Sequence, residues 1–172
     1  YDRLVGSEMC IRDRISSHSP IWVFQSNKIL DSLLVTKIEV DIINFLNNWT
    51  SHNLEIKSSY KILHGLFLII SVESNFSNPS GCSIDKLINF IKKINQLYDI
   101  DFLNRLNISY RDGNMVKLVD IAGFKKLILE GTIKSDTIIF NNTLNIKAEL
   151  NENWEIKASK SWCKKYFYGK QN

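Results

Sequence analysis

The spacing of hydrophobic residues predicts two amphipathic helices in the first part of the chain. Apolar side chains recur every three or four positions after Asp31 and Ser32, either of which can cap the first helix. The second helix, predicted over residues 83–98, follows a polar turn at residues 80–83. The apolar positions are Leu34, Ile38, Ile42, Phe45, Leu46 and Trp49 in the first helix and Leu87, Ile88, Ile91 and Ile94 in the second.

Short apolar or alternating segments around these helices predict strands. Residues 21–25 form an apolar run, residues 54–62 alternate, and residues 66–72 are mostly apolar, which is typical of a central strand. His64–Gly65 between the last two predicts a tight turn. With a further strand over residues 106–110, the order β-α-β-β-α-β predicts an α+β protein with a ferredoxin-like core.

The pattern after this core predicts a C-terminal β-α-β-α extension. Asp112–Gly113 is a strong hairpin signal, followed by a returning strand over residues 115–119. A helix is predicted over residues 121–130, a strand over residues 136–140 and a short helix over residues 147–154.

The two ends of the chain differ from this body in composition. Residues 5–14, VGSEMCIRDR, resemble the peptide that results when sequencing-adapter DNA is translated by mistake, so we expect residues 1–14 to be non-native. We expect a single α+β domain over residues 15–156. Residues 157–172 form a basic, aromatic tail with five lysines and no acidic residue.

Charge argues against nucleic-acid binding by the body of the domain. The net charge of the whole chain is +4, but residues 15–156 carry 14 basic and 15 acidic residues. In the tail, lysines alternate with aromatic residues, a composition that can bind single-stranded nucleic acid or a membrane surface. We favour the simpler interpretation, in which some aromatic side chains dock on the domain and the lysines stay solvated. The aromatic residues are Trp162, Tyr166, Phe167 and Tyr168.

The cysteines predict neither a disulfide framework nor a zinc site. Without the adapter-like segment only Cys82 and Cys163 remain, and no set of histidine, cysteine and carboxylate residues has the spacing of metal ligands. Two distant cysteines suit a reducing compartment, so we expect a cytoplasmic protein. The longest apolar run, residues 66–70, is far shorter than the ~20 residues of a membrane helix. No cofactor can be inferred.

The polar turn before the second helix is the main candidate site. A helix N-terminus presents unpaired N–H groups and the positive end of the helix dipole, which can hold an anion or stabilise a thiolate. Cys82 is the candidate nucleophile, and His52, after the first helix, is the candidate base. The favoured alternative is structural, with His52 at a helix C-terminus and Cys82 as a small buried side chain.

A ligand-binding face is expected around the loop of residues 73–85. Asp85 has a second interpretation, because a carboxylate in the first turn stabilises a helix and disfavours a thiolate at Cys82. The candidate ligand-binding residues are Gln25, Trp49, Glu73, Ser80, Gly81, Ser83 and Asp85.

Arg105 and Arg111 are the only arginines outside the adapter-like segment. In a chain that otherwise uses lysine, they indicate planar, bidentate pairing with a carboxylate. We expect a structural ion pair with Asp101 or Asp112.

Several stretches of the chain resemble a family of short bacterial proteins whose members often carry the label "ABC transporter ATPase". These stretches are IWVFQSNKIL from residue 21, NWTSHN from 48, SGCSID from 80, ISYRDG from 108, and DTIIFNNTLNIKAELNENWEI from 136, followed by SW at 161–162. The label implies a G-x-x-x-x-G-K-[ST] loop that cradles phosphates. None of the seven glycines is followed by Lys-Ser or Lys-Thr, so we expect no ATP hydrolysis by this chain.

Three functions remain open. We favour a module that binds a small molecule or a protein partner and does no chemistry of its own. The second candidate is a cysteine-dependent enzyme that uses Cys82 with His52 as base. The third is an accessory protein that bears the ATPase label without ATPase activity.

Overall fold

The computed structural model describes residues 16–73 and 79–168, so the adapter-like segment, residues 1–14, and part of the 73–85 loop lie outside it.

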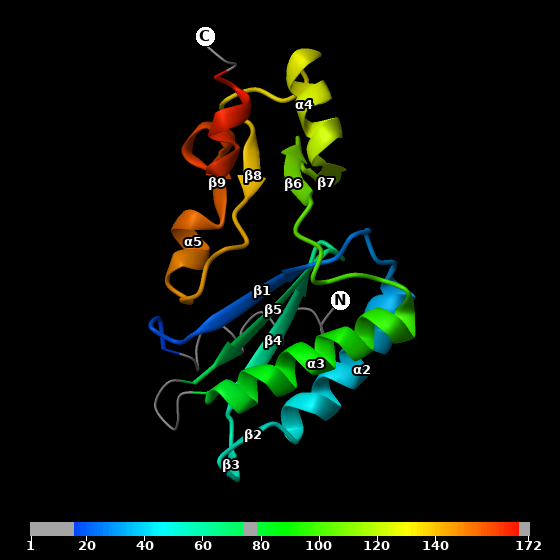
Figure 1. The fold of residues 1–172 in the computed structure, drawn as a ribbon, viewed down its shortest axis with the longest axis vertical. Coiled ribbons are helices and arrows are strands. Elements are labelled where there is room, and N and C mark those ends of the chain that lie inside the picture. The colour runs from blue at the N-terminus through cyan, green and yellow to red at the C-terminus, as the bar shows by residue number, and fades with distance from the viewer. Residues whose placement is uncertain (1–15, 74–78, 169–172) are drawn as a thin grey trace.

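Helices and antiparallel sheets confirm the predicted α+β class (Figure 1). In these residues no helix combines the length and apolar character of a membrane span. The elements are β1 (Ile21–Gln25), α2 (Ser32–Asn47), β2 (Thr50–Ser51), β3 (Leu54–Glu55), β4 (Ser58–Leu63), β5 (Phe67–Val72), α3 (Gly81–Tyr98), β6 (Asn107–Asp112), β7 (Met115–Asp120), α4 (Ile121–Leu129), β8 (Ile138–Phe140), α5 (Glu149–Asn153), β9 (Glu155–Lys157), and the 3₁₀ turns η1 (Ala158–Lys160) and η2 (Trp162–Tyr166).

α2 and α3 cover one face of the first sheet, whose strand order is β1-β5-β4 (Figure 1). The Asp31 carboxylate caps α2 by accepting a hydrogen bond from the backbone N–H of Leu34 at 2.8 Å. Each helix buries one apolar stripe at the spacing that the sequence predicts. The buried apolar positions are Ile38, Ile42 and Leu46 in α2 and Leu87, Ile91 and Ile94 in α3.

β5 is the central strand, and all six of its residues are buried, as predicted. Because side chains alternate along a strand, Leu68 and Ile70 pack toward the helices, whereas Phe67 and Ile69 pack on the other face. On that second face they meet residues of the second sheet, including Phe140. β5 therefore belongs to two hydrophobic cores at once.

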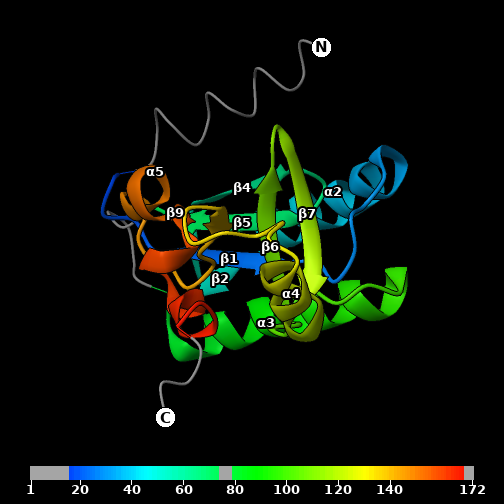
Figure 2. The same ribbon diagram turned by 90° about the horizontal axis from the view of Figure 1, so that it is seen from above.

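The ferredoxin-like topology is not confirmed. The order β1-β5-β4 agrees with three strands of that fold, but β6 does not join them as a fourth strand. β6 pairs with β7 and β8 in a second sheet of order β7-β6-β8-β9, and the backbone of residues 145–146 contacts the start of β1 instead. Figure 2 shows this second layer from above, lying over the first sheet.

The described part of the predicted tail folds against the second sheet. β9 pairs with β8, and the side chains of Ala158 and Cys163 are fully buried beside Phe124 of α4. Tyr166 and Phe167 also pack on Phe124, with ring centroids 6.0 and 6.4 Å away. A third hydrophobic core thus lies between α4, the second sheet and the 3₁₀ turns.

Two hairpin turns follow the predicted turn chemistry. His64 and Gly65 both have positive φ, 56° and 57°, as a type I′ turn between β4 and β5 requires. A Cβ on Gly65 would lie only 2.6 Å from the carbonyl oxygen of Leu30, so glycine is needed for space as well as for φ. Gly113 has φ 60° in the predicted β6–β7 hairpin.

Gln25 joins the end of β1 to the second sheet through its buried amide group. The residue is 6% exposed, and its Nε2 donates to the carbonyl oxygen of Asn107 at 3.1 Å. Its Oε1 accepts from Ser109 Oγ at 2.6 Å and from Asn142 Nδ2 at 2.8 Å. Asn142 in turn accepts from the indole N–H of Trp154 at 3.0 Å. Buried polar groups of this kind are costly to leave unpaired.

Arg111 forms an ion pair between β6 and β9, and the predicted partner was wrong. The guanidinium donates two hydrogen bonds, each 2.6 Å long, to the two carboxylate oxygens of Glu155 rather than to Asp101 or Asp112. The bidentate geometry is the one that the choice of arginine indicates. Hydrogen bonds from Arg111 hold the pKa of the Glu155 carboxyl below its usual value, although burial opposes the shift.

We expect Gln25→Ala to lower the free energy of unfolding by about 2–4 kcal/mol, because Ser109 and Asn142 lose a buried partner and a small cavity forms. Gln96→Ala, at an exposed position of α3, is the matched control and should change it by less than about 0.5 kcal/mol. Urea unfolding measures both variants. Equal effects of the two substitutions would contradict the assigned role of Gln25.

We expect the effect of Glu155→Gln on stability to depend on pH. A carboxylate whose folded pKa is lowered stabilises the fold above its unfolded pKa, about 4.3, and this contribution is lost as the pH falls through the folded value. The variant should therefore cost about 1 kcal/mol at pH 7 and progressively less toward pH 3. Glu55→Gln, on exposed β3, controls for removal of a charge. A constant cost from pH 7 to pH 3 would be inconsistent with the pair.

Candidate functional site

α2 and α3 run antiparallel, so the end of α2 and the start of α3 meet at one end of the first sheet. The indole N–H of Trp49 donates to the carbonyl oxygen of Ser83 at 2.9 Å. The backbone N–H of Ser80 donates to Ser51 Oγ at 3.3 Å. The structure thus brings together the candidate residues that follow α2 and those that begin α3.

The serines of this region form hydrogen bonds with backbone groups rather than line a cavity. Ser80 is the N-cap of α3, and its hydroxyl accepts from the backbone N–H of Ser83 at 3.2 Å. Ser83 is buried, and its hydroxyl donates to the carbonyl oxygen of Thr50 at 3.3 Å. Because the helix begins at Gly81, Asp85 lies beyond the first turn and is exposed. A Cβ on Gly81 would meet open space.

Cys82 and His52 are both exposed at this end of the domain. Cys82 is therefore not the buried side chain of the structural alternative. His52 does not lie at a helix C-terminus, because it forms the β2–β3 turn with Asn53, with φ 50° and 65°. No hydrogen bond joins His52 to Cys82 in the described ranges. The other described thiol, Cys163, is buried, and burial raises its pKa to about 11.

The remaining two candidates lie apart from each other. Glu73 follows β5 at the end from which the chain leads to α3, and it is half-buried. Gln25 pairs with Phe67 at the opposite end of β5, and its amide is occupied by the second sheet. Gln25 is thus separated from the other candidates by the length of the strand.

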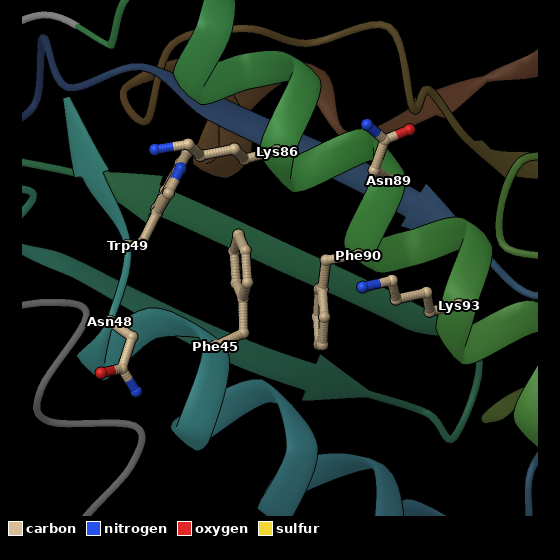
Figure 3. A pocket seen from close by; sticks show the side chains of 7 residues that line it. All are labelled: Phe45, Asn48, Trp49, Lys86, Asn89, Phe90 and Lys93. Atoms are coloured by element: carbon tan, nitrogen blue, oxygen red, sulfur yellow. The ribbon is translucent and has the colours of Figure 1, made fainter. Parts of the chain in front are cut away.

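A groove between α2 and α3, absent from the sequence-based predictions, adjoins this region (Figure 3). Its volume is about 350 Å³. Phe45 and Phe90 stack across it, with ring centroids 4.3 Å apart and planes 7° apart, and Trp49 lies 5.5 Å from Phe45. The seven lining residues include two lysines and no acidic residue. They are Phe45, Asn48, Trp49, Lys86, Asn89, Phe90 and Lys93.

All polar residues of the groove lining except Asn48 come from one face of α3. Lys86, Asn89 and Lys93 follow Cys82 at intervals of four, three and four residues, which places all four on one side of a helix with 3.6 residues per turn. The exposed thiol of Cys82 therefore stands at the N-terminal end of the stripe that lines the groove. This interval pattern was the signal in the sequence that could have revealed the groove.

A second cavity of about 570 Å³ lies around the turn that follows β8. Its lining carries both charge signs, with Glu149, Glu152 and Lys160 among asparagines. It therefore lacks the single charge preference of the α2–α3 groove. Across the described residues, no group of three or more histidine, cysteine, aspartate or glutamate side chains could hold a metal ion.

Comparison with known proteins assigns no relative to this chain. No family model matches it, and neither a curated protein nor a solved structure is significantly similar to it.

Proposed function

We propose that this protein is a binding module whose α2–α3 groove takes a small anionic molecule with an apolar or planar part. The observation that supports this proposal is the combination of stacked phenylalanines with Lys86 and Lys93 in an open groove whose lining contains no carboxylate. Its volume lies at the lower end of the range typical of small-molecule sites, roughly 300–1,000 Å³.

The chemistry of the lining determines the ligand class. Ammonium groups bind phosphate or carboxylate as point charges, and the amides of Asn48 and Asn89 add donors and acceptors. The rings of Phe45 and Phe90 are already stacked on each other, so the apolar part of the ligand would lie across them rather than between them. Figure 3 shows these rings between the two helices, with Lys86 and Lys93 at separate positions along α3.

Side-chain hydrogen bonds join the segments of α2 and α3 on both sides of the phenylalanine stack. Toward one end, the Trp49 indole is hydrogen-bonded to Ser83 and is 1% exposed. Toward the other end, the hydroxyl of Tyr98 donates to Asp41 at 2.6 Å. A groove whose walls are fixed before binding loses little entropy when a ligand enters.

The cysteine-dependent enzyme is supported by less. Cys82 is exposed and lies in the first turn of α3, where a helix dipole favours an anion. A base is needed within hydrogen-bonding reach of the thiol, and His52 makes no such contact. The accessory role rests on the resemblance to the family labelled "ABC transporter ATPase".

We expect the double variant Lys86→Ala/Lys93→Ala to bind an anionic aromatic probe, 8-anilinonaphthalene-1-sulfonate, about tenfold more weakly than the unsubstituted protein, because two charges near the ligand are lost. Fluorescence titration measures the affinity. Lys37→Ala/Lys92→Ala is the charge-matched control, since both lysines are exposed on the helices outside the groove lining. If both variants bind the probe as the unsubstituted protein does, the groove is not its site.

A second measurement separates binding from cysteine catalysis. Iodoacetamide should alkylate Cys82 at the same rate in the unsubstituted protein and in His52→Ala, because no hydrogen bond joins His52 to the thiol in the described residues. Peptide mass spectrometry follows Cys82 separately from Cys10 and Cys163. A rate about fivefold or more lower in His52→Ala would instead favour the enzyme, because a base that activates the thiol was removed.

A further inference from the structure

α4 and η2 form one end of the molecule, the upper end in Figure 1, and large apolar residues of this region are exposed. Leu129 is 88% exposed at the end of α4, Tyr168 is 64% exposed, and Trp162 is 43% exposed. Leu129 lies one helical turn after Lys125, whose Nζ is 5.2 Å from the ring centroid of Tyr166 in η2. The two elements therefore contribute to one surface.

Lysines alternate with the aromatic rings of this surface. Lys165 Nζ lies 5.5 Å from the ring centroid of Trp162 and 5.2 Å from that of Tyr166. Lys164 Nζ lies 5.7 Å from the ring centroid of Tyr168. We call this surface the basic aromatic tip. It consists of Lys125, Leu129, Trp162, Lys164, Lys165, Tyr166 and Tyr168.

The tip is presented by an ordered scaffold. Cys163 is fully buried within η2, and its backbone N–H donates to the Ser161 hydroxyl at 3.0 Å. That hydroxyl donates in turn to the carbonyl oxygen of Ala158 at 2.8 Å. Packing of Tyr166 on Phe124 fixes η2 against α4. Because these side chains are already placed, a partner would not have to order the segment.

The tip is positively charged, and the segment that carries Lys164 and Lys165 supplies no acidic residue to neutralise them. Residues 157–168 contain four lysines and no acidic residue. Glu130 directly follows α4. Its carboxylate pairs with the Nζ of Lys126 at 3.7 Å rather than with a lysine of the tip. The tip thus combines apolar side chains with a field that attracts anions.

We propose that the basic aromatic tip docks this protein reversibly on an anionic lipid surface. Trp and Tyr favour the headgroup region of a bilayer, and nearby lysines are attracted to anionic lipids. Leu129 adds an aliphatic side chain that can insert among acyl chains. These features favour a membrane over single-stranded nucleic acid, because Leu129 offers no ring for stacking and lysines already lie over the rings of Trp162 and Tyr166.

Vesicle co-sedimentation tests the proposal with the full chain. The protein should sediment with phosphatidylcholine vesicles that contain about 30% phosphatidylserine, and not with pure phosphatidylcholine vesicles. Raising the salt from about 50 to about 300 mM should weaken binding, because it shortens the screening length. Binding should also shift Trp162 fluorescence to the blue, a change that Trp162→Phe removes.

Variants of the tip are compared with a charge-matched control. Lys164→Ala/Lys165→Ala should lower partitioning about 25-fold, since each lysine near the surface contributes roughly a fivefold gain. Leu129→Ser should lower it without a change in charge. Lys37→Ala/Lys92→Ala removes two exposed lysines of α2 and α3 and should leave it unchanged. Thermal unfolding verifies that each variant is folded.

Three results would overturn the proposal. The first is equal binding to charged and neutral vesicles, or to neither. The second is a loss of binding in the control variant as large as that in Lys164→Ala/Lys165→Ala. The third is binding of a labelled thymidine oligonucleotide at a salt concentration at which anionic vesicles stay unbound, which would assign the tip to single-stranded nucleic acid.

Discussion

β5 is buried on both faces along its whole length, and two layers of the molecule therefore pack against one strand. Alternation of side chains assigns Leu68, Ile70 and Val72 to the helical layer and Phe67 and Ile69 to the second sheet. A register shift of one residue would turn the side chains of β5 that face the helices toward the second sheet, and those that face the second sheet toward the helices. The two cores therefore fix the register of this strand. Beside it, Gln25 is joined by three hydrogen bonds to the second sheet and to the turn after β8.

This arrangement separates the two surfaces that we assign to binding. The α2–α3 groove belongs to the layer on one face of β5, and the basic aromatic tip belongs to the part of the second layer built on α4 and η2 (Figure 1). α2 and α3 lie side by side on the first sheet, and Phe45 and Phe90 stack between them. An open groove toward solvent remains at this stack. Because different cores support the two surfaces, substitutions at one should leave the other intact.

The sequence predicted the elements because their signals are local. Periodicity located α2 and α3, Asp31 marked a cap, and His64–Gly65 marked a turn. The hairpin signal predicted that β6 pairs with β7, but pairing between distant strands has no such local signal, so β6 was expected beside β1 although its other neighbour is β8. The same limit applies to side-chain partners: Glu155 is 44 residues from Arg111, and nothing near either one indicates the other. The groove was missed because Phe45 and Phe90 look like core positions until the helices are placed together.

The near-neutral body of the chain gave no electrostatic indication of a binding site, yet the α2–α3 groove has two lysines and no acidic residue in its lining. The two statements agree because charges act over a short range in salt solution, with a screening length of about 8 Å under physiological conditions. The acidic residues nearest to the groove along the two helices, Asp41 and Asp85, lie outside its lining. The charges that line a site act on an anionic ligand at the shortest distance, and their arrangement depends on how helices and strands are placed rather than on composition.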